Sequence, residues 1–354
     1  MSKTTTGGAP DTAAPASDCL RVLTRQDFQS PQTVRWCPGC GDYSILAQIQ
    51  RVLPELRVPR ENFVFVSGIG CSSRLPYYVN TYGFHTIHGR APAVATGVKC
   101  ANPNLSVWVV TGDGDGLSIG TNHLIHTIRR NVDLNILLFN NRIYGLTKGQ
   151  YSPTSEFGKK TKSSPMGTIE QPIRPIQMAL AAEGTFVART IAADPAHLRE
   201  TLERAARHRG TSFVEILQNC RVFNDGTFDD LKGRDAAEDD RILLRHGEPL
   251  RFGAGERKGI TARNLTPQIV DLDSSETPAG DLLVHDERAN SPALAALLAA
   301  LEPPEFPVAL GVFRALDRPT YDSLLSAQIT GAAEQRGQGD VRQLLNAGTT
   351  WEVE

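Results

Sequence analysis

Residues 112–141 read GDGDGLSIGTNHLIHTIRRNVDLNILLFNN, and this stretch decides the fold. Apolar runs end just before Gly112 and just before Asn140, a pattern typical of parallel strands that are buried on both faces. Asp113 and Asn141 are separated by 28 positions, which leaves room for one crossover helix and one strand. The stretch therefore predicts a right-handed βαβ unit in a doubly wound α/β sheet.

The two ends of this unit carry residues suited to a metal-bound diphosphate. They should meet at the carboxyl edge of the sheet, where a helix beginning at Gly116 would point free amides at phosphate. Mg²⁺ prefers about six oxygen ligands, and Asp113, Asn141 and the Ile143 carbonyl would supply three beside diphosphate and water. Such a loop on its own could be only a turn. With the second half at this spacing, the pattern matches the thiamine diphosphate signature GDG…NN.

The rest of the chain alternates strands and helices, as expected for a mostly parallel sheet. We predict strands at residues 63–67, 106–111, 134–139, 185–189 and 212–216. We predict helices at residues 43–53, 91–101, 117–130, 176–183 and 195–207. This domain should span residues 20–228, after a disordered head at 1–19. From about Asp229 charge rises and long strands are expected to stop, so residues 229–354 are predicted to form a partly irregular extension that packs on the same chain or on a partner, with one helical stretch at 291–302.

Composition excludes several classes of function. The 354 residues have a net charge of −2, and Lys and Arg are interspersed with Asp and Glu, so no nucleic-acid-binding surface is indicated. No apolar run is long enough to span a membrane, and the amino-terminal residues contain no signal-peptide core. We expect a cytoplasmic protein with neither a membrane nor a nucleic acid as partner.

Four of the six cysteines are expected at one centre. Cys37 and Cys40 form a CPGC turn, whereas Cys71 and Cys220 follow predicted strands at the same edge of the sheet as the diphosphate loop. Four thiolates bind either Zn²⁺ or an iron–sulfur cluster. One Cys-x-x-Cys turn with two remote cysteines, next to a redox-capable cofactor, favours a [4Fe–4S] cluster over zinc and over a thioredoxin-like site. Cys19 and Cys100 are left outside this set.

Several segments resemble the β subunit of 2-oxoacid:ferredoxin oxidoreductases. They are CPGCGDYSIL, SGIGCSSRLPYY, GFHTIHGRAPAVATGVK, GDGDGLSIGTNHLIH, NNRIYGLTKGQYSPTS and ILQNC, in order between residues 35 and 225. The branch that uses 2-oxoglutarate is the most similar, with pyruvate and other 2-oxoacids as alternatives.

The resemblance implies a cofactor and a ligand set. One [4Fe–4S] cluster would be held by Cys37, Cys40, Cys71 and Cys220, and Mg²⁺ by Asp113, Asn141 and the Ile143 carbonyl. Thiamine diphosphate would be lined by Ile69, Gly70, Cys71, Ser72, His88, Gly112, Gly114, Asp115, Gly145 and Leu146. His85 we interpret as a structural hydrogen-bonding residue.

Two cations are candidates for the substrate or the electron acceptor. Arg74 stands where the family often has lysine, and a guanidinium can clamp a carboxylate with two hydrogen bonds. We therefore expect Arg74 to bind the substrate carboxylate rather than to form a surface ion pair. Lys148 could play the same part or receive ferredoxin.

The implied reaction is oxidative decarboxylation of a 2-oxoacid with coenzyme A, with electrons leaving through the cluster to ferredoxin. A glutamate needed to activate thiamine would come from an α subunit, in a dimer of heterodimers. A non-redox thiamine decarboxylase or carboligase would not need the four cysteines. A zinc-stapled subunit without chemistry would not need Asp113 and Asn141.

Overall fold

The molecule is built on one large sheet whose strands run mostly in parallel. The computed structural model describes residues 22–232, 238–274 and 281–353. The main sheet has the order β2-β1-β3-β4-β6-β5-β11-β7. Its strands are β1 (Phe63–Ser67), β2 (Tyr82–His85), β3 (Ser106–Gly112), β4 (Leu134–Asn140), β5 (Phe186–Ile191), β6 (Thr211–Leu217), β7 (Arg241–Leu244) and β11 (Val308–Ala315). The first six are parallel to one another, and β11 with β7 runs the opposite way.

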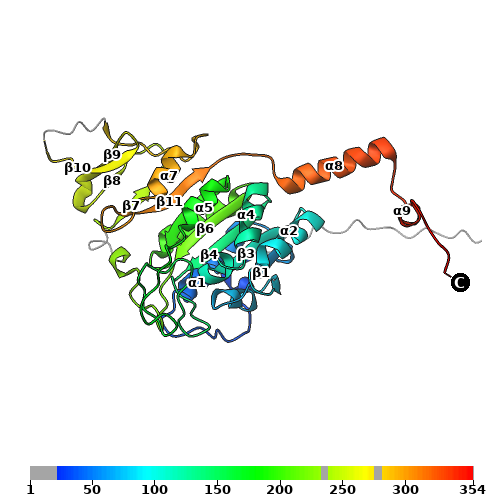
Figure 1. The fold of residues 1–354 in the computed structure, drawn as a ribbon, viewed down its shortest axis with the longest axis horizontal. Coiled ribbons are helices and arrows are strands. Elements are labelled where there is room, and N and C mark those ends of the chain that lie inside the picture. Colours follow the sequence, from blue (N-terminus) through cyan, green and yellow to red (C-terminus); the bar gives the residue numbers. More distant parts are fainter. Residues whose placement is uncertain (1–21, 233–237, 275–280, 354) are drawn as a thin grey trace, which may run out of the picture.

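Helices cover both faces of this sheet (Figure 1). The helices on the two faces are α1 (Asp42–Glu55), α2 (Ala91–Ala101), α4 (Thr121–Arg130), α5 (Pro175–Ala181), α6 (Pro195–Arg207) and α7 (Ala293–Ala299). The short α3 (Asp113–Gly116) follows β3, and α8 (Tyr321–Arg336) and α9 (Val341–Leu345) follow β11. Successive strand residues point to opposite faces. Val107 and Val109 pack with α2, α4, α5 and α7, whereas Trp108 and Val110 pack with α1 and α6. The predicted doubly wound α/β class is confirmed.

The βαβ unit is present, with one correction. β3 and β4 are parallel neighbours, with Val109 opposite Ile136. The helix predicted from Leu117 instead begins at Thr121, after the four-residue α3 and a turn. At this turn the backbones of Gly89 and Gly120 touch, because a Cβ added to Gly120 would lie 2.9 Å from the Gly89 Cα. The chain therefore breaks its helix where the loop before α2 crosses it.

The carboxyl-terminal extension is more regular than the sequence suggested. The expectation that long strands stop near Asp229 was wrong, because β11 has eight residues and is buried between β5 and β7. A second sheet, β10-β9-β8, contains β8 (Arg251–Phe252), β9 (Lys258–Arg263) and β10 (Thr266–Asp271). The run VALGVF in β11 supplies the apolar residues that extend the main sheet beyond β5. The extension therefore completes the main fold and adds a small antiparallel sheet.

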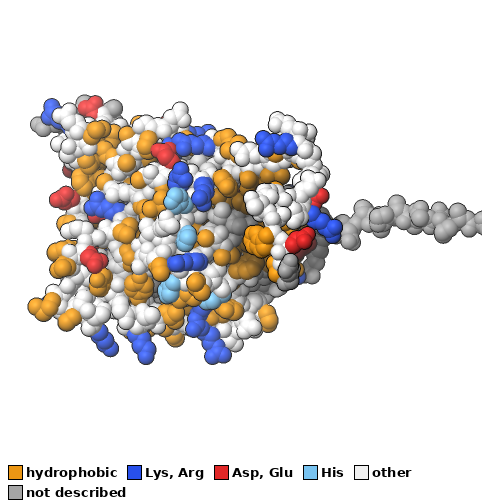
Figure 2. All heavy atoms as spheres, turned by 45° about the vertical axis from the view of Figure 1, so that its right-hand side comes forward, with side chains coloured by type: hydrophobic (Ala, Val, Ile, Leu, Met, Phe, Trp, Pro, Cys, Tyr) orange, Lys and Arg blue, Asp and Glu red, His pale blue; other side chains and the backbone are white. Residues whose placement is uncertain are grey.

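After β11 the chain leaves the body as a projecting arm made of α8 and α9 (Figure 1). Its root is fixed, because Tyr321 N donates to Asn131 O at 3.1 Å and Asp133 N donates to Asp322 Oδ1 at 3.0 Å. Figure 2 brings the arm's side forward and shows basic and hydrophobic side chains interspersed there. The head predicted at residues 1–19 lies outside the described residues. Within the described ranges, no helix combines the length and the apolar character that a membrane crossing requires.

Candidate functional site

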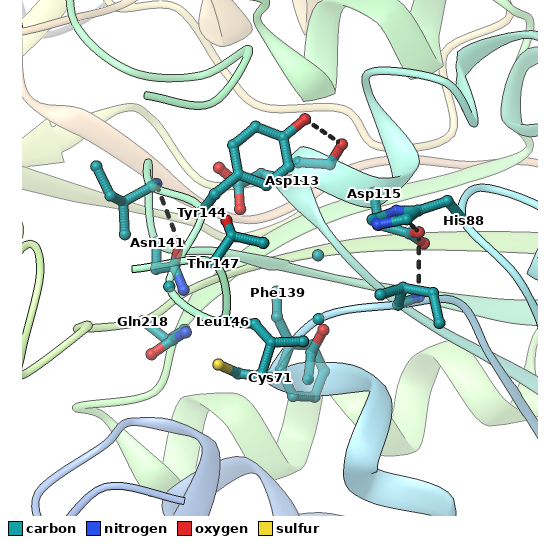
Figure 3. Close-up of a pocket in the computed structure, with 17 residues that line it drawn as sticks. Cys71, His88, Asp113, Asp115, Phe139, Asn141, Tyr144, Leu146, Thr147 and Gln218 are labelled. Atoms are coloured by element: carbon teal, nitrogen blue, oxygen red, sulfur yellow. Dashed lines mark hydrogen bonds and ion pairs between the residues drawn. The ribbon is translucent and has the colours of Figure 1, made fainter. Parts of the chain in front are cut away.

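A small pocket opens at the carboxyl ends of β1, β3 and β4, where adjacent strands of the parallel sheet expose their loops (Figure 3). It is the place where an open α/β sheet binds its ligand. The structure brings all the sequence-predicted thiamine and magnesium residues to its wall: Ile69, Gly70, Cys71, Ser72, His88, Gly112, Asp113, Gly114, Asp115, Asn141, Ile143, Gly145 and Leu146. We call it the diphosphate pocket.

The tight loop around Gly114 is shaped by a tyrosine that the sequence reasoning missed. The Tyr144 hydroxyl donates to the Gly114 carbonyl at 2.8 Å (Figure 3). A Cβ added to Gly114 would lie 2.2 Å from the Tyr144 ring. The glycine is therefore required for the close approach of β3's loop to the loop after β4.

Asp113 is prepared for a cation. Its side chain is buried, and its Oδ2 accepts hydrogen bonds from Ser152 Oγ at 2.5 Å and Thr154 Oγ1 at 2.7 Å. Burial raises the pKa of Asp113 to about 6, although these hydrogen bonds act in the opposite direction. A desolvated carboxylate of this kind is stabilised by a bound cation. Asp113 therefore fits the expected magnesium ligand.

The other two expected magnesium ligands lie on a fixed turn. Asn141 Oδ1 accepts from Ile143 N at 3.1 Å, and Asn224 Nδ2 donates to the Asn141 carbonyl at 2.9 Å. Arg142 between them has a positive φ of 56°, which sharpens the turn. Among the described residues, no group of three His, Cys, Asp or Glu side chains is arranged around a single metal ion. The expected magnesium set contains only one such side chain, with amide and carbonyl oxygens for the rest.

Asp115 acts as a brace in this structure. Its carboxylate accepts hydrogen bonds from Ile69 N at 3.1 Å, Gly89 N at 2.8 Å and Thr111 Oγ1 at 2.7 Å. His88 Nδ1 lies 3.1 Å from the same carboxylate, and its ring is half exposed at the pocket wall (Figure 3). Asp115 thus joins the loops after β1, β2 and β3. Its carboxylate lines the pocket with its hydrogen-bonding capacity already used by these partners.

The four predicted cysteines surround a second cavity of about 230 Å³, the thiol cavity. One hydrogen bond closes the CPGC turn, and two others join it to the remote segments. Cys40 N donates to Cys37 O at 3.1 Å and closes the CPGC turn. Trp36 Nε1 donates to the Cys71 carbonyl at 2.7 Å, and Gly41 N donates to Asn219 O at 3.3 Å, one residue before Cys220.

Two of the four thiols, Cys40 and Cys71, lie in a desolvated environment, whereas Cys37 is exposed. Burial, followed by the nearby Asp42 and the other thiols, raises the pKa of Cys71 to about 12. Burial also raises the pKa of Cys40, again with contributions from Asp42 and from Cys71. Thiolates at this place therefore need a positively charged group to compensate them, which fits a metal cluster. Cys100 is half-buried on α2 and does not line the cavity, and Cys19 lies outside the described residues.

The two cavities share part of their walls. The common residues are Cys71, Asn141, Gly145, Leu146 and Gln218. A Cβ added to Gly145 would lie 3.4 Å from Cys220 Sγ and 3.6 Å from Cys71 Sγ. The Oε1 atom of Gln218 is buried there, and no described residue hydrogen-bonds to it. The groups that would occupy the two cavities are therefore separated by little more than this wall.

Comparison with known proteins identifies the family of the chain. The family model described as "Thiamine pyrophosphate enzyme, C-terminal TPP binding domain" matches residues 68–216. The chain is 51% identical to 2-oxoglutarate oxidoreductase subunit KorB of Mycobacterium tuberculosis over 356 aligned residues, which cover 100% of this chain and 93% of the relative. The chain belongs to the β subunits of the 2-oxoacid:ferredoxin oxidoreductases.

Other relatives agree with this family. A 2-oxoacid:ferredoxin oxidoreductase β subunit of Aeropyrum pernix is 49% identical over 190 residues, covering 54% of this chain and 60% of that protein. A solved 2-oxoglutarate:ferredoxin oxidoreductase from Magnetococcus marinus, with 2-oxoglutarate, coenzyme A and succinyl-CoA bound, has a TM-score of 0.72 and 31% identity. That match covers 95% of this chain and 100% of the other. This chain is thus a β subunit of the 2-oxoglutarate oxidoreductase type, which functions with an α subunit.

The β subunit has a third cavity, of about 440 Å³, beside the diphosphate pocket. The two share Ile69, Gly70 and Leu146. Arg74 lines this cavity and is half-buried, and within the described residues no ion pair is recorded for it. It also lines the thiol cavity, as does the exposed Lys148.

Sequence reasoning missed several residues of these walls. His85 Nδ1 lies 3.0 Å from Ser73 O and 3.1 Å from Ser67 Oγ, in agreement with the structural role expected for it. The missed wall residues are Arg35, Phe139, Tyr144, Thr147 and Gln218. Ser152 and Thr154, which donate to Asp113 without lining a cavity, were missed as well. The hydroxyl-rich run Ser152–Ser155 and the glutamine two positions before Cys220 were the available signals.

Proposed function

We propose that this chain provides the thiamine diphosphate and iron–sulfur half of a 2-oxoglutarate:ferredoxin oxidoreductase. The complex would convert 2-oxoglutarate and coenzyme A to succinyl-CoA and CO₂, and transfer two electrons, one at a time, to ferredoxin. The reaction is reversible. The observation that carries the proposal is the wall shared by the diphosphate pocket and the thiol cavity, because electron transfer requires the two groups to be close.

Each group has its own set of residues in this proposal. Cys37, Cys40, Cys71 and Cys220 hold one [4Fe–4S] cluster, which is supported by the cavity that they surround. Asp113, Asn141 and the Ile143 carbonyl hold Mg²⁺. The remaining residues of the diphosphate pocket line thiamine diphosphate, which when bound supplies the electron sink for decarboxylation.

Arg74 binds a carboxylate of the 2-oxoacid in this proposal. The support is its place in the cavity that adjoins the diphosphate pocket, together with a guanidinium that no described acidic side chain neutralises. Lys148 is exposed at the mouth of the thiol cavity, where a positive charge suits the approach of an acidic ferredoxin or assists Arg74.

The α subunit completes the site in this proposal. It supplies the glutamate that activates thiamine, and part of the coenzyme A site. The β subunit alone is therefore expected to bind its cofactors without turning over. Full oxidation of 2-oxoglutarate by the purified single chain would refute this division of labour.

The decisive test is an anaerobic preparation of the co-expressed complex. Iron, sulfide, zinc and thiamine are measured, and viologen reduction is followed with 2-oxoglutarate, pyruvate, branched-chain and aromatic 2-oxoacids. We expect about four iron atoms per β chain and the highest kcat/KM with 2-oxoglutarate. Zinc without iron would contradict the cluster, thiamine without iron would indicate a non-redox enzyme, and a preference for pyruvate would correct the substrate.

A further inference from the structure

A chain of buried polar groups crosses the sheet behind the diphosphate pocket. Arg189 on β5 and Glu215 on β6 are cross-strand partners, and Arg189 Nε donates to Glu215 Oε2 at 2.7 Å. Asn140, at the end of β4, donates from Nδ2 to the other oxygen, Glu215 Oε1, at 2.7 Å. All three side chains are nearly inaccessible to solvent. None of them lines the diphosphate pocket.

Asn140 connects these buried groups to the turn that carries two of the expected magnesium ligands. Its Oδ1 accepts from Arg142 N at 3.2 Å, which fixes the turn that presents Asn141 and Ile143. Thr154 Oγ1 lies 2.9 Å from the same Oδ1 and 2.7 Å from Asp113 Oδ2, and its single hydroxyl proton is shared between these two acceptors. A reversed amide would place its nitrogen, a donor, against the amide of Arg142. The acceptor at Glu215 therefore selects the amide orientation that the turn requires.

The buried ion pair between Arg189 and Glu215 is unfavourable unless both charges are compensated. Burying a carboxylate and a guanidinium costs more free energy than an apolar pair of the same size in many proteins. Each charge here is directed to a specific partner. Arg189 also reaches β11, where its guanidinium lies 5.7 Å from the Phe313 ring and Nη1 lies 3.5 Å from Ala309 O.

We propose that Glu215, whose buried charge Arg189 neutralises, is a positioning residue for the magnesium site, because its carboxylate fixes the Asn140 amide and, through it, the 140–143 turn. The inference rests on the proposed function and names the residues that prepare its metal site. The strand β11 supports this arrangement, since Phe313 and Ala309 contact the guanidinium that neutralises Glu215.

Two double variants separate positioning from mere stability, and both remove the ion pair without leaving a lone buried charge. Arg189→Met/Glu215→Met removes the acceptor for Asn140, whereas Arg189→Met/Glu215→Gln keeps a side-chain oxygen there. The control Arg204→Met/Glu287→Gln removes another ion pair, of 2.8 Å, that joins α6 to the extension away from the pocket. Each is prepared as the anaerobic complex with the α subunit.

Mg²⁺ is titrated at saturating thiamine diphosphate, and cofactor binding is followed by calorimetry. For the Met/Met variant we expect half-saturation at about tenfold higher Mg²⁺, the effect of one buried hydrogen-bond partner lost. The Met/Gln variant and the control should stay within about threefold of the parent. At saturating Mg²⁺, kcat should recover in all of them.

An equal loss in the Met/Met and Met/Gln variants, or an unchanged Met/Met variant, would overturn the inference. If the Met/Met complex does not assemble, Asn140→Ala decides, because it removes the amide and leaves the ion pair intact. That variant should also need about tenfold more Mg²⁺, and unchanged binding would refute the role of the amide. Absence of Mg²⁺-dependent thiamine binding in the parent complex would instead refute the proposed function.

Discussion

The diphosphate pocket and the thiol cavity share a wall, but they are assembled in different ways. Most of the diphosphate pocket comes from loops at the ends of the neighbouring strands β1, β3 and β4. The thiol cavity joins three segments centred on residues 37–40, 71 and 220, which are held by single hydrogen bonds such as that from Trp36 to Cys71. A pocket built on strand adjacency should survive the loss of one residue better than a cavity built from distant loops.

Removal of one thiol should have the largest effect on activity and should leave the diphosphate pocket intact. We expect Cys220→Ser to lower the iron content well below that of the parent complex, and activity by more than about a hundredfold, since the cluster loses a ligand. Thiamine diphosphate should still bind, because Cys220 does not line the diphosphate pocket. Metal analysis and electron paramagnetic resonance measure the first effect, and calorimetry measures the second.

Cys100→Ser is the matched control, because this thiol is half-buried on α2 away from the cavity. It should keep the iron content of the parent. Loss of thiamine binding in Cys220→Ser would show that the two sites are not independent.

The second prediction concerns a substitution in the diphosphate pocket. Asp113→Ala should weaken Mg²⁺-dependent thiamine diphosphate binding by about a hundredfold, because it removes the only carboxylate among the expected magnesium ligands. Iron content should stay at the level of the parent. Calorimetry with and without Mg²⁺ gives the affinity, and retained binding would exclude Asp113 as a metal ligand.

A substitution of Arg74, which lines both the third cavity and the thiol cavity, tests the proposed substrate site. Arg74→Met should raise the KM for 2-oxoglutarate by about tenfold or more, the value of a charge-assisted hydrogen bond, with iron and thiamine content unchanged. Steady-state kinetics with viologen as acceptor measures this. Arg51→Met, an exposed position on α1, is the control. An unchanged KM would sink the assignment.

The smallest expected effect lies outside both cavities. Burial lowers the pKa values of His197, His208 and His285 below the ordinary 6.5. The unfolded chain then binds more protons than the folded chain below that pH, so stability should fall as pH decreases through about 6.5. Melting temperature measured from pH 8 to 5.5 should show this, and His197→Gln should reduce the slope. An identical slope in that variant would remove His197 as a contributor.

The sequence predicted those parts of the fold whose signals are local. The apolar runs and the spacing from Asp113 to Asn141 predicted β3, β4 and their parallel pairing, because a parallel strand buried on both faces is a continuous run of apolar residues. The start of α4 was misplaced by four residues, since the contact between Gly89 and Gly120 is tertiary. β11 was missed because it follows short strands joined by polar loops and pairs antiparallel with a strand more than 100 residues earlier.

The sequence by itself determined the doubly wound class, the family and which side chains can ligate a metal or a cluster, because these depend on residue type and on short spacing. Only the tertiary structure decided that Cys37, Cys40, Cys71 and Cys220 surround one cavity, and that this cavity shares a wall with the diphosphate pocket. It also placed Arg189 and Glu215 behind Asn140. Contacts of this kind join residues far apart in the chain, and their partners are set by strand order and loop packing rather than by any local pattern.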